Sequence, residues 1–330
     1  MTVLVTGGGG ALGLTICRML RARGTAVRSV SRGDYPVLRE LGVECHQGDL
    51  SDPAVARAAV AGCEAVMHVA GRTGSFGPHT LYIPSNLTST ENLLAACKEA
   101  GIRRFVYTST PSVVHGGGDV AGADESSPYP PGYATAYQST KAAAEKLVLA
   151  ANGPDIATVA LRPHLVWGAG DSNLTMRVIA RARAGKLRLV GDGSNKVDGC
   201  YIDNAADAHI LALDKVKKGA RCAGKAYFVT NDEPMPTRDL INGIVQSAGL
   251  PPVTRTVSPG VAKFVGSILE IVWTLMGRTD EPPMTRFVAT QLSTAHWYSI
   301  VAIKRDLGYK PRISTKEGFK RLRESFAAEA

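Results

Sequence analysis

The sequence contains no low-complexity tract, no repeat of solenoid length and no pair of cysteines at metal-ligand spacing. The first two absences exclude fibrous, repetitive and largely disordered proteins. The six cysteines form neither a CxxC pair nor a Cys/His cluster, so we predict no metal site and reduced, mostly buried thiols. We expect no signal peptide, because a strand-like run at residues 3–6 follows Met1 almost directly. We therefore expect a cytoplasmic location.

Positive charge is in excess but is not concentrated enough to indicate a nucleic-acid surface. The formal net charge is +9, yet the lysines and arginines are scattered, and only residues 304–323 are dense in them. We interpret that stretch as a solvated helical face and expect no nucleic-acid partner. A positive field is better suited to an anionic cofactor or substrate.

The hydrophobic pattern predicts an α/β fold. In the first half of the 330 residues, short β-rich runs alternate with longer helical patterns, which is typical of a Rossmann-type, doubly wound parallel sheet. The predicted strands are residues 3–6, 26–31, 44–47, 65–69, 105–108, 157–162 and, after a gap, 226–230. Glycine and proline become frequent after residue 167, which indicates a smaller C-terminal lobe.

The late buried strand implies that the two parts of the chain interleave. We assign residues 1–165, with a returning segment at about 200–230, to a nucleotide-binding core. Residues 166–199 and 231–330 form the predicted substrate-binding lobe.

A glycine-rich turn follows the first predicted strand and precedes an amphipathic run at 14–23. Without a Cβ, the backbone N–H groups of such a turn can approach a pyrophosphate at the positive end of the helix dipole. Its place between a strand and a helix favours dinucleotide binding over a merely flexible loop. The predicted contacts in the GxxGxxG motif are Gly7, Gly10, Ala11, Leu12 and Gly13.

The residues after the second and third strands indicate the choice of cofactor. Ser31 and Arg32 stand where NAD-binding proteins present a carboxylate, and they can bind a 2′-phosphate, so NADP(H) is preferred over NAD(H) despite the nearby Asp34. Asp49, followed by Leu50, can accept a hydrogen bond from the adenine amino group or can cap the next helix. Both alternatives stay open.

Tyr137 and Lys141 lie one turn apart at the start of a strongly helical segment. A phenol with a pKa of about 10 is a poor acid or base, and a cation one turn away is expected to bring that pKa toward the working range. The spacing alone is common. Here no other tyrosine has a lysine four residues later, and hydroxyl side chains at 107–110 end the preceding strand.

These motifs, together with Asn86 and in this order, resemble those of the extended short-chain dehydrogenases/reductases over nearly the whole chain. Segments 108–113, 161–163, 201–205 and 226–231 are similar to the 3β-hydroxysteroid dehydrogenase branch. Within it, segments 187–196, 285–287 and 296–299 resemble bacterial reductases of 2-alkyl-3-oxoalkanoates in long-chain olefin biosynthesis.

The resemblance implies a role for each matching residue. Tyr137 is the proton donor or acceptor, Lys141 binds the nicotinamide ribose and tunes Tyr137, and Thr110 hydrogen-bonds the substrate oxygen. Many relatives have serine at the position of Thr110, so Ser109 and Ser112 stay alternatives.

Other residues are predicted to support the site or complete the cofactor contacts. Asn86 supports the site through backbone or water contacts, unless it is only a helix cap. Ala70 and Pro163 complete the predicted cofactor contacts, and His164 can line the pocket. We expect a homodimer.

The apolar segment 261–276 is too short and too charged to span a bilayer, which needs about 20 predominantly apolar residues. We interpret it first as a helix that covers an apolar substrate pocket, and second as a membrane-surface or partner-enzyme contact.

The predicted function is NADPH-dependent reduction of the 3-oxo group of a lipid-like substrate, most specifically a 2-alkyl-3-oxoalkanoate. The alternatives are 3β-hydroxysteroid oxidation, epimerisation or dehydration of a nucleotide sugar, and a non-catalytic NADP(H)-sensing regulator.

Overall fold

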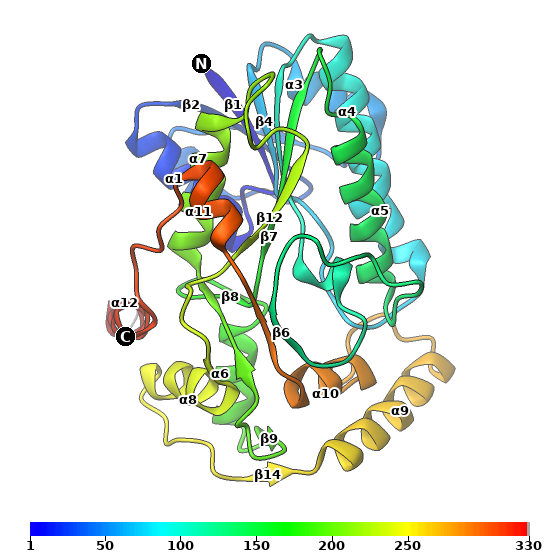
Figure 1. Cartoon of the computed structure of the whole chain (residues 1–330), viewed down its shortest axis with the longest axis vertical. Helices are drawn as coiled ribbons and strands as arrows, with labels where there is room; N and C mark the ends of the chain where they lie inside the picture. Colours follow the sequence, from blue (N-terminus) through cyan, green and yellow to red (C-terminus); the bar gives the residue numbers. More distant parts are fainter. Residues whose placement is uncertain (329–330) are drawn as a thin grey trace.

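A seven-stranded parallel sheet forms the centre of the computed structural model, which describes residues 1–328 (Figure 1). Its strand order is β12-β7-β5-β4-β1-β2-β3. The strands are β1 (Thr2–Thr6), β2 (Ala26–Ser31), β3 (Glu44–Gln47), β4 (Ala65–His68), β5 (Arg104–Thr108), β7 (Ala157–Pro163) and β12 (Lys225–Val229). The Rossmann-type sheet is confirmed, and each predicted strand end lies within one residue of the observed one.

The order of the strands reverses beside β1, which pairs with β2 on one side and with β4 on the other. In open α/β sheets, ligands bind outside the carboxyl ends of the strands at such a switch point. The segments that follow β1, β2 and β4 are therefore the expected cofactor surface.

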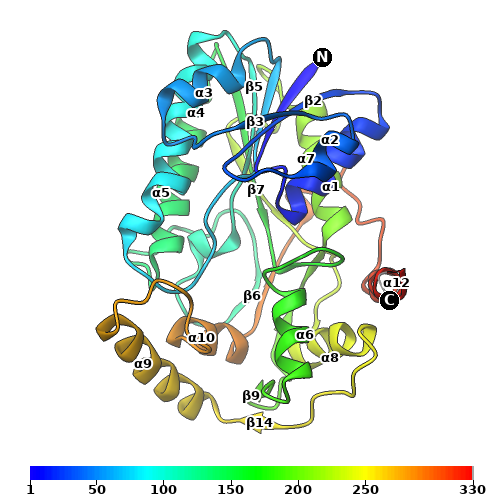
Figure 2. The ribbon, with the colours of Figure 1, turned by 180° about the vertical axis from the view of Figure 1, so that it is seen from behind.

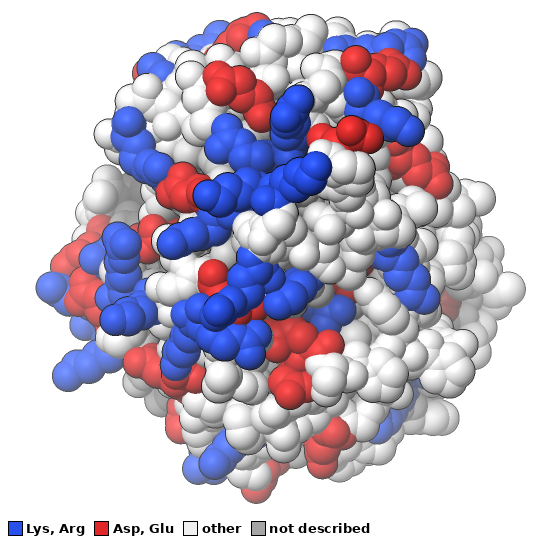
Figure 3. All heavy atoms as spheres, turned by 45° about the horizontal axis from the view of Figure 1, so that its top comes forward, with Lys and Arg blue, Asp and Glu red and all other residues white. Residues whose placement is uncertain are grey.

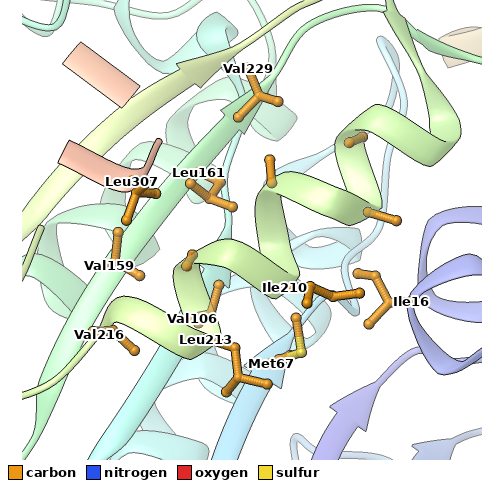
Figure 4. Close-up of a cluster of buried hydrophobic side chains, with 14 of the residues drawn as sticks. Ile16, Met67, Val106, Val159, Leu161, Ile210, Leu213, Val216, Val229 and Leu307 are labelled. Atoms are coloured by element: carbon orange, nitrogen blue, oxygen red, sulfur yellow. The ribbon is translucent and has the colours of Figure 1, made fainter. Parts of the chain in front are cut away.

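Helices cover both faces of the sheet (Figure 2). One layer contains α1 (Ala11–Ala22), α7 (Ile202–Lys215) and α11 (Val301–Leu307), with α2 (Pro36–Glu40) at its edge. The other contains α3 (Pro53–Val60), α4 (Ser89–Glu99) and α5 (Ala136–Ala150). Figure 4 shows that Ile210 and Leu213 of α7 pack against Met67, Val106 and Val159, which are side chains of the sheet. Burying each such side chain contributes roughly 1.5–3 kcal/mol.

A second, four-stranded sheet has the order β13-β10-β15-β6. Its strands are β6 (Val120–Ala123), β10 (Lys196–Val197), β13 (Met235–Pro236) and β15 (His296–Tyr298). Because β6 comes from the first half of the chain, the second sheet is assembled from both halves. The division at residues 165, 200 and 230 stays a proposal.

Short elements complete this smaller part and connect it to the core. Two-stranded sheets pair β8 (Val166–Trp167) with β11 (Cys200–Tyr201) and β9 (Leu189–Val190) with β14 (Thr256–Val257). The helices are α6 (Thr175–Arg183), α8 (Thr237–Ser247), α9 (Pro259–Leu275), α10 (Arg286–Ser293) and α12 (Thr315–Ala328). Single helical turns are η1 (His79–Leu81), η2 (Pro84–Thr88) and η3 (Pro111–Val114).

Charged side chains of both signs share the surface in Figure 3, where Lys and Arg are interspersed with Asp and Glu. In the basic stretch 304–323, Arg305 pairs with Asp306 at 2.7 Å and Arg321 pairs with Asp203 at 3.2 Å. These pairs fit the predicted solvated surface. All six cysteines are free and five of them are buried, as predicted. Within residues 1–328, the helices are too short or too polar to cross a membrane.

Candidate cofactor and catalytic site

In the glycine turn between β1 and α1, a Cβ on Gly7 or Gly13 would collide with backbone atoms. Gly7 has a φ of +69°, and its N–H donates to the Val30 carbonyl oxygen at 3.0 Å. A Cβ on Gly13 would lie 2.3 Å from the Gly7 carbonyl oxygen. The first-turn N–H groups of Ala11, Leu12 and Gly13 have no acceptor within the helix, so they are available to an anion. The turn has the shape that a pyrophosphate needs.

The end of β2 offers a hydroxyl and a guanidinium to an adenosine ribose. The Ser31 hydroxyl oxygen is buried without a hydrogen-bond partner among residues 1–328, and Arg32 is exposed. The Asp34 carboxylate is held by Arg39, whose Nη2 donates at 3.0 Å. That hydrogen bond lowers the pKa of Asp34. The Asp34 carboxylate, which argued for NAD(H) in the sequence, is thus already paired with the Arg39 guanidinium.

Asp49 does not cap the helix that follows it. Asp52 is the N-cap of α3, because its carboxylate accepts from the Ala54 N–H at 2.7 Å. Asp49 instead accepts from the Ser51 N–H at 2.9 Å and stays exposed. The adenine contact of Asp49 stays a prediction, and so does the predicted cofactor contact of the buried Leu50.

Buried hydroxyls and one imidazole connect the glycine turn to α4. The Thr6 oxygen accepts from the N–H groups of Val69 and Ala70 at 3.1 and 3.0 Å. Its own O–H is therefore free to donate to Nδ1 of His68, 2.8 Å away. Nε2 of His68 then bears the proton and donates to Thr90 at 3.0 Å. Burial lowers the pKa of His68 to about 3, which agrees with this neutral form.

The chain of hydrogen bonds ends at Asn86, in the π-helical turn η2. The Thr90 hydroxyl donates to the Asn86 carbonyl oxygen at 2.7 Å. The Asn86 side chain accepts from the Arg72 N–H at 2.7 Å and donates to the Arg72 carbonyl and to the Thr140 hydroxyl, both at 3.1 Å. Asn86 is not a helix cap: it ties the segment after β4 to α5. No spacing in the sequence indicated this connection through His68.

Tyr137 and Thr110 meet at the carboxyl end of the sheet. Thr135 caps α5, because its hydroxyl accepts from the Gln138 N–H at 3.2 Å. Burial raises the pKa of Tyr137, and a hydrogen bond with the Thr110 side chain opposes that rise. The Thr110 oxygen accepts from the Ser112 N–H at 3.2 Å, which leaves its O–H free to donate. Of the two alternatives to Thr110, Ser109 is buried with its hydroxyl unpartnered within the described chain.

Within residues 1–328 no hydrogen bond joins Lys141 to Tyr137, and the effect of Lys141 on the pKa of Tyr137 stays a prediction. Nζ of Lys141 donates to the Thr108 carbonyl oxygen at 2.6 Å and lies 4.2 Å from the centre of the Tyr107 ring. Burial lowers the pKa of Lys141 to about 7, against the opposing charge of Glu145 one turn later. The ammonium group is thus engaged by a carbonyl and a ring, and burial is the largest influence on the pKa of Tyr137.

A buried ion pair lies behind the catalytic helix. Glu145 accepts from Nη2 and Nε of Arg162 at 2.7 and 2.9 Å, and also from the Tyr129 hydroxyl at 2.7 Å. Both charged side chains are almost completely buried. The pair fixes α5 to β7, whose last residue is Pro163, a predicted cofactor contact.

His164 is buried between the core and the smaller part of the chain. Its Nδ1 lies 2.7 Å from the Asp198 carbonyl oxygen, and its Nε2 lies 2.9 Å from Nδ1 of His296 in β15. The segment after β4 also contacts the smaller part of the chain, because the Ser75 hydroxyl donates to the Glu281 carboxylate at 3.1 Å. No spacing in the sequence indicated these contacts.

The sequence from residue 4 to residue 259 matches the model of the 3-beta hydroxysteroid dehydrogenase/isomerase family. The chain belongs to this family. A 2-alkyl-3-oxoalkanoate reductase from Stenotrophomonas maltophilia is 50% identical over 99% of this chain and 100% of its own length. One from Shewanella oneidensis is 46% identical over 97% of this chain and 85% of its own. A 3 beta-hydroxysteroid dehydrogenase/Delta 5-->4-isomerase from Mycobacterium tuberculosis is 32% identical over 96% and 87%.

Solved structures share the fold of this family member. The UDP-glucose 4-epimerase of Thermotoga maritima superposes with a TM-score of 0.78 at 19% identity, covering 100% of this chain and 99% of that one. The UDP-glucuronic acid 4-epimerase of Bacillus cereus, in complex with UDP-glucuronic acid and NAD, gives a TM-score of 0.76 at 20% identity and covers both chains completely. The chain is an NAD(P)-dependent oxidoreductase of the short-chain dehydrogenase/reductase type.

Proposed function

We propose that this enzyme reduces the 3-oxo group of a 2-alkyl-3-oxoalkanoate to the 3-hydroxy acid with NADPH, as a step of olefin biosynthesis. The observation that supports a reductase best is the approach of the Thr110 side chain to the Tyr137 phenol at the carboxyl end of the sheet, on the side of the glycine turn. The two reductase relatives support the substrate.

The site residues supply and position one proton. NADPH, when bound, supplies the hydride that adds to the carbonyl carbon. Tyr137 is protonated at neutral pH, because burial raises its pKa above the ordinary value of about 10. Its proton passes to the substrate oxygen as the C=O double bond becomes C–O, and the Thr110 O–H donates a hydrogen bond to the same oxygen. Solvent then restores the proton on the phenolate.

Three features support NADPH over NADH: the unpartnered Ser31 hydroxyl, the exposed Arg32 guanidinium and the pairing of Asp34 with Arg39. A guanidinium binds a 2′-phosphate with charge-assisted hydrogen bonds. Arg32→Ala is expected to raise KM for NADPH at least tenfold and to leave KM for NADH unchanged. Equal effects on both cofactors would contradict this preference.

The substrate is tested by following NADPH absorbance with a 2-alkyl-3-oxo acid and, in parallel, NADP⁺ reduction with a 3β-hydroxysteroid. Turnover of the acid is expected. The second candidate, steroid oxidation, is favoured by the Mycobacterium tuberculosis relative and would replace the first if only the steroid reacts. An epimerase would show no net NADPH oxidation, and a regulator would bind NADPH without turnover. Light scattering tests the expected homodimer.

A further inference from the structure

Helix α9 presents its large apolar side chains to solvent. Phe264, Ile271 and Leu275 are 66%, 59% and 82% exposed. With them, Val261, Val265, Ile268, Val272 and Met276 are also exposed. Their spacing of three and four residues places them along one side of the helix. The prediction that these side chains cover a substrate pocket is wrong, because they face away from the protein.

The opposite side of α9 fixes this orientation. Only Ala262 and Gly266 are buried, and a Cβ on Gly266 would lie 2.7 Å from the Thr285 carbonyl carbon. Glu270 accepts from Nε of Arg286 at 2.7 Å and from its backbone N–H at 2.8 Å. Small residues and this ion pair therefore hold α9 closely against the start of α10. Rotation of the apolar side toward the protein would break these contacts.

Exposed cations lie on and beside α9. Five of them have no ion-pair partner within residues 1–328, namely Arg183, Lys186, Arg188, Arg255 and Lys263. The pairing of β9 with β14 brings the chain at Arg188 close to Arg255. The N–H of the next residue, Leu189, donates to the Arg255 carbonyl oxygen at 3.0 Å. In Figures 1 and 2, β9, β14 and α9 follow one another along the end of the molecule opposite the N-terminus.

We propose that α9 and these cations form a docking surface for an anionic lipid membrane. Large apolar side chains on one side of a helix, flanked by unpaired cations, are the composition of interfacial helices that lie on a membrane without crossing it. A second copy of the chain would place the same cations close to each other, which opposes self-association through this surface. The proposal rests on the lipid-like substrate proposed above, because docking would bring the enzyme to the phase in which such a substrate collects.

The test is co-sedimentation of the full chain with vesicles of phosphatidylcholine alone or mixed with phosphatidylglycerol. Binding is expected only to the mixed vesicles and should weaken with salt. The triple variant Phe264→Gln, Ile271→Gln, Leu275→Gln should lose at least tenfold in binding, and so should Arg255→Glu with Lys263→Glu. Val301→Gln and Lys217→Glu, at exposed positions away from α9, are the matched controls and should bind like the parent.

Turnover of a soluble, short-chain substrate separates the two proposals. All variants should keep it, because none lies in the catalytic site, and its absence in the parent would count against the proposed function alone. Equal sedimentation of the parent and the triple variant would overturn lipid docking. So would light scattering in which the parent is a dimer and the triple variant a monomer, since α9 would then contact a second copy.

Discussion

The imidazole of His68 joins the hydroxyl of Thr6, 2.8 Å away, to the hydroxyl of Thr90, 3.0 Å away on its other side. Thr6 fixes the segment after β4 beside the glycine turn, and Thr90 holds the turn that contains Asn86. His68 therefore connects the cofactor loop with the residues beside the catalytic helix.

His68→Leu is expected to raise KM for NADPH and to lower kcat, each several-fold. The change removes the acceptor of the Thr6 O–H and the donor to the Thr90 oxygen, at about 1–3 kcal/mol each. His68→Gln keeps an amide donor toward Thr90 and should recover part of both constants. Because His68 is neutral, neither variant should shift the pH profile of kcat. A loss of stability with unchanged kcat and KM would make His68 merely structural.

Gly13→Ala and Gly10→Ala separate the shape of the glycine turn from contact with the cofactor. A Cβ on Gly13 would lie 2.3 Å from the Gly7 carbonyl oxygen, whereas one on Gly10 would lie 3.4 Å from it. Gly13→Ala should therefore destabilise the cofactor-free protein by about 1–3 kcal/mol and weaken NADPH binding. Gly10→Ala should weaken NADPH binding with little effect on stability. Thermal unfolding and fluorescence titration measure the two effects, and equal stability of both variants would contradict the clash at Gly13.

Glu145→Gln is expected to destabilise the protein by about 3–5 kcal/mol, because it leaves the Arg162 guanidinium buried without its counter-charge. The double variant Glu145→Gln, Arg162→Met should recover most of the loss. Urea unfolding measures both. A single variant as stable as the parent would show that solvent reaches this ion pair.

Stability should fall as the pH drops below about 6.5, the ordinary histidine pKa. Burial lowers the pKa of His68 to about 3 and those of His209 and His296 to about 4. Between these values and 6.5 the unfolded chain binds more protons, so their contribution is complete above pH 6.5 and is lost toward pH 4. Burial lowers the pKa values of His115 and His164 as well, which adds to this effect. Burial raises the pKa of Asp198 to about 6 and also raises those of Glu125, Asp203 and Asp207, and these four carboxyl groups act in the opposite direction.

The measurement is the free energy of unfolding between pH 5 and 8. His209→Gln should reduce its slope by up to about 1.4 kcal/mol per pH unit, the value for one proton. A flat profile in the parent would contradict the buried neutral histidines.

The sequence was sufficient to predict the central sheet, because each of its strands is a buried apolar run bounded by turns. The second sheet was missed, since β10 and β13 have two residues each and β6 pairs with β15, more than 170 positions away. Such short strands have no pattern of their own and form only when distant segments meet.

The candidate site was predicted as far as local motifs extend. Thr110 and Tyr137 lie together in space, and the glycine turn has the shape that its spacing implies. The helical spacing places Lys141 near Tyr137 but does not show that its Nζ turns to the Thr108 carbonyl, so the expected effect of Lys141 on the pKa of Tyr137 stays a prediction. The outward orientation of α9 was also missed, because an apolar stripe does not reveal which side of a helix contacts the protein.

The measurement that tests the account most directly compares Tyr137→Phe with the parent enzyme, with NADPH oxidation and NADPH binding followed on the same preparations. Loss of the phenolic proton should reduce turnover by a factor of about 10² to 10⁴ while the dissociation constant of NADPH stays nearly unchanged. Turnover equal to that of the parent, with NADPH bound equally well, would contradict the role of Tyr137 as the acid.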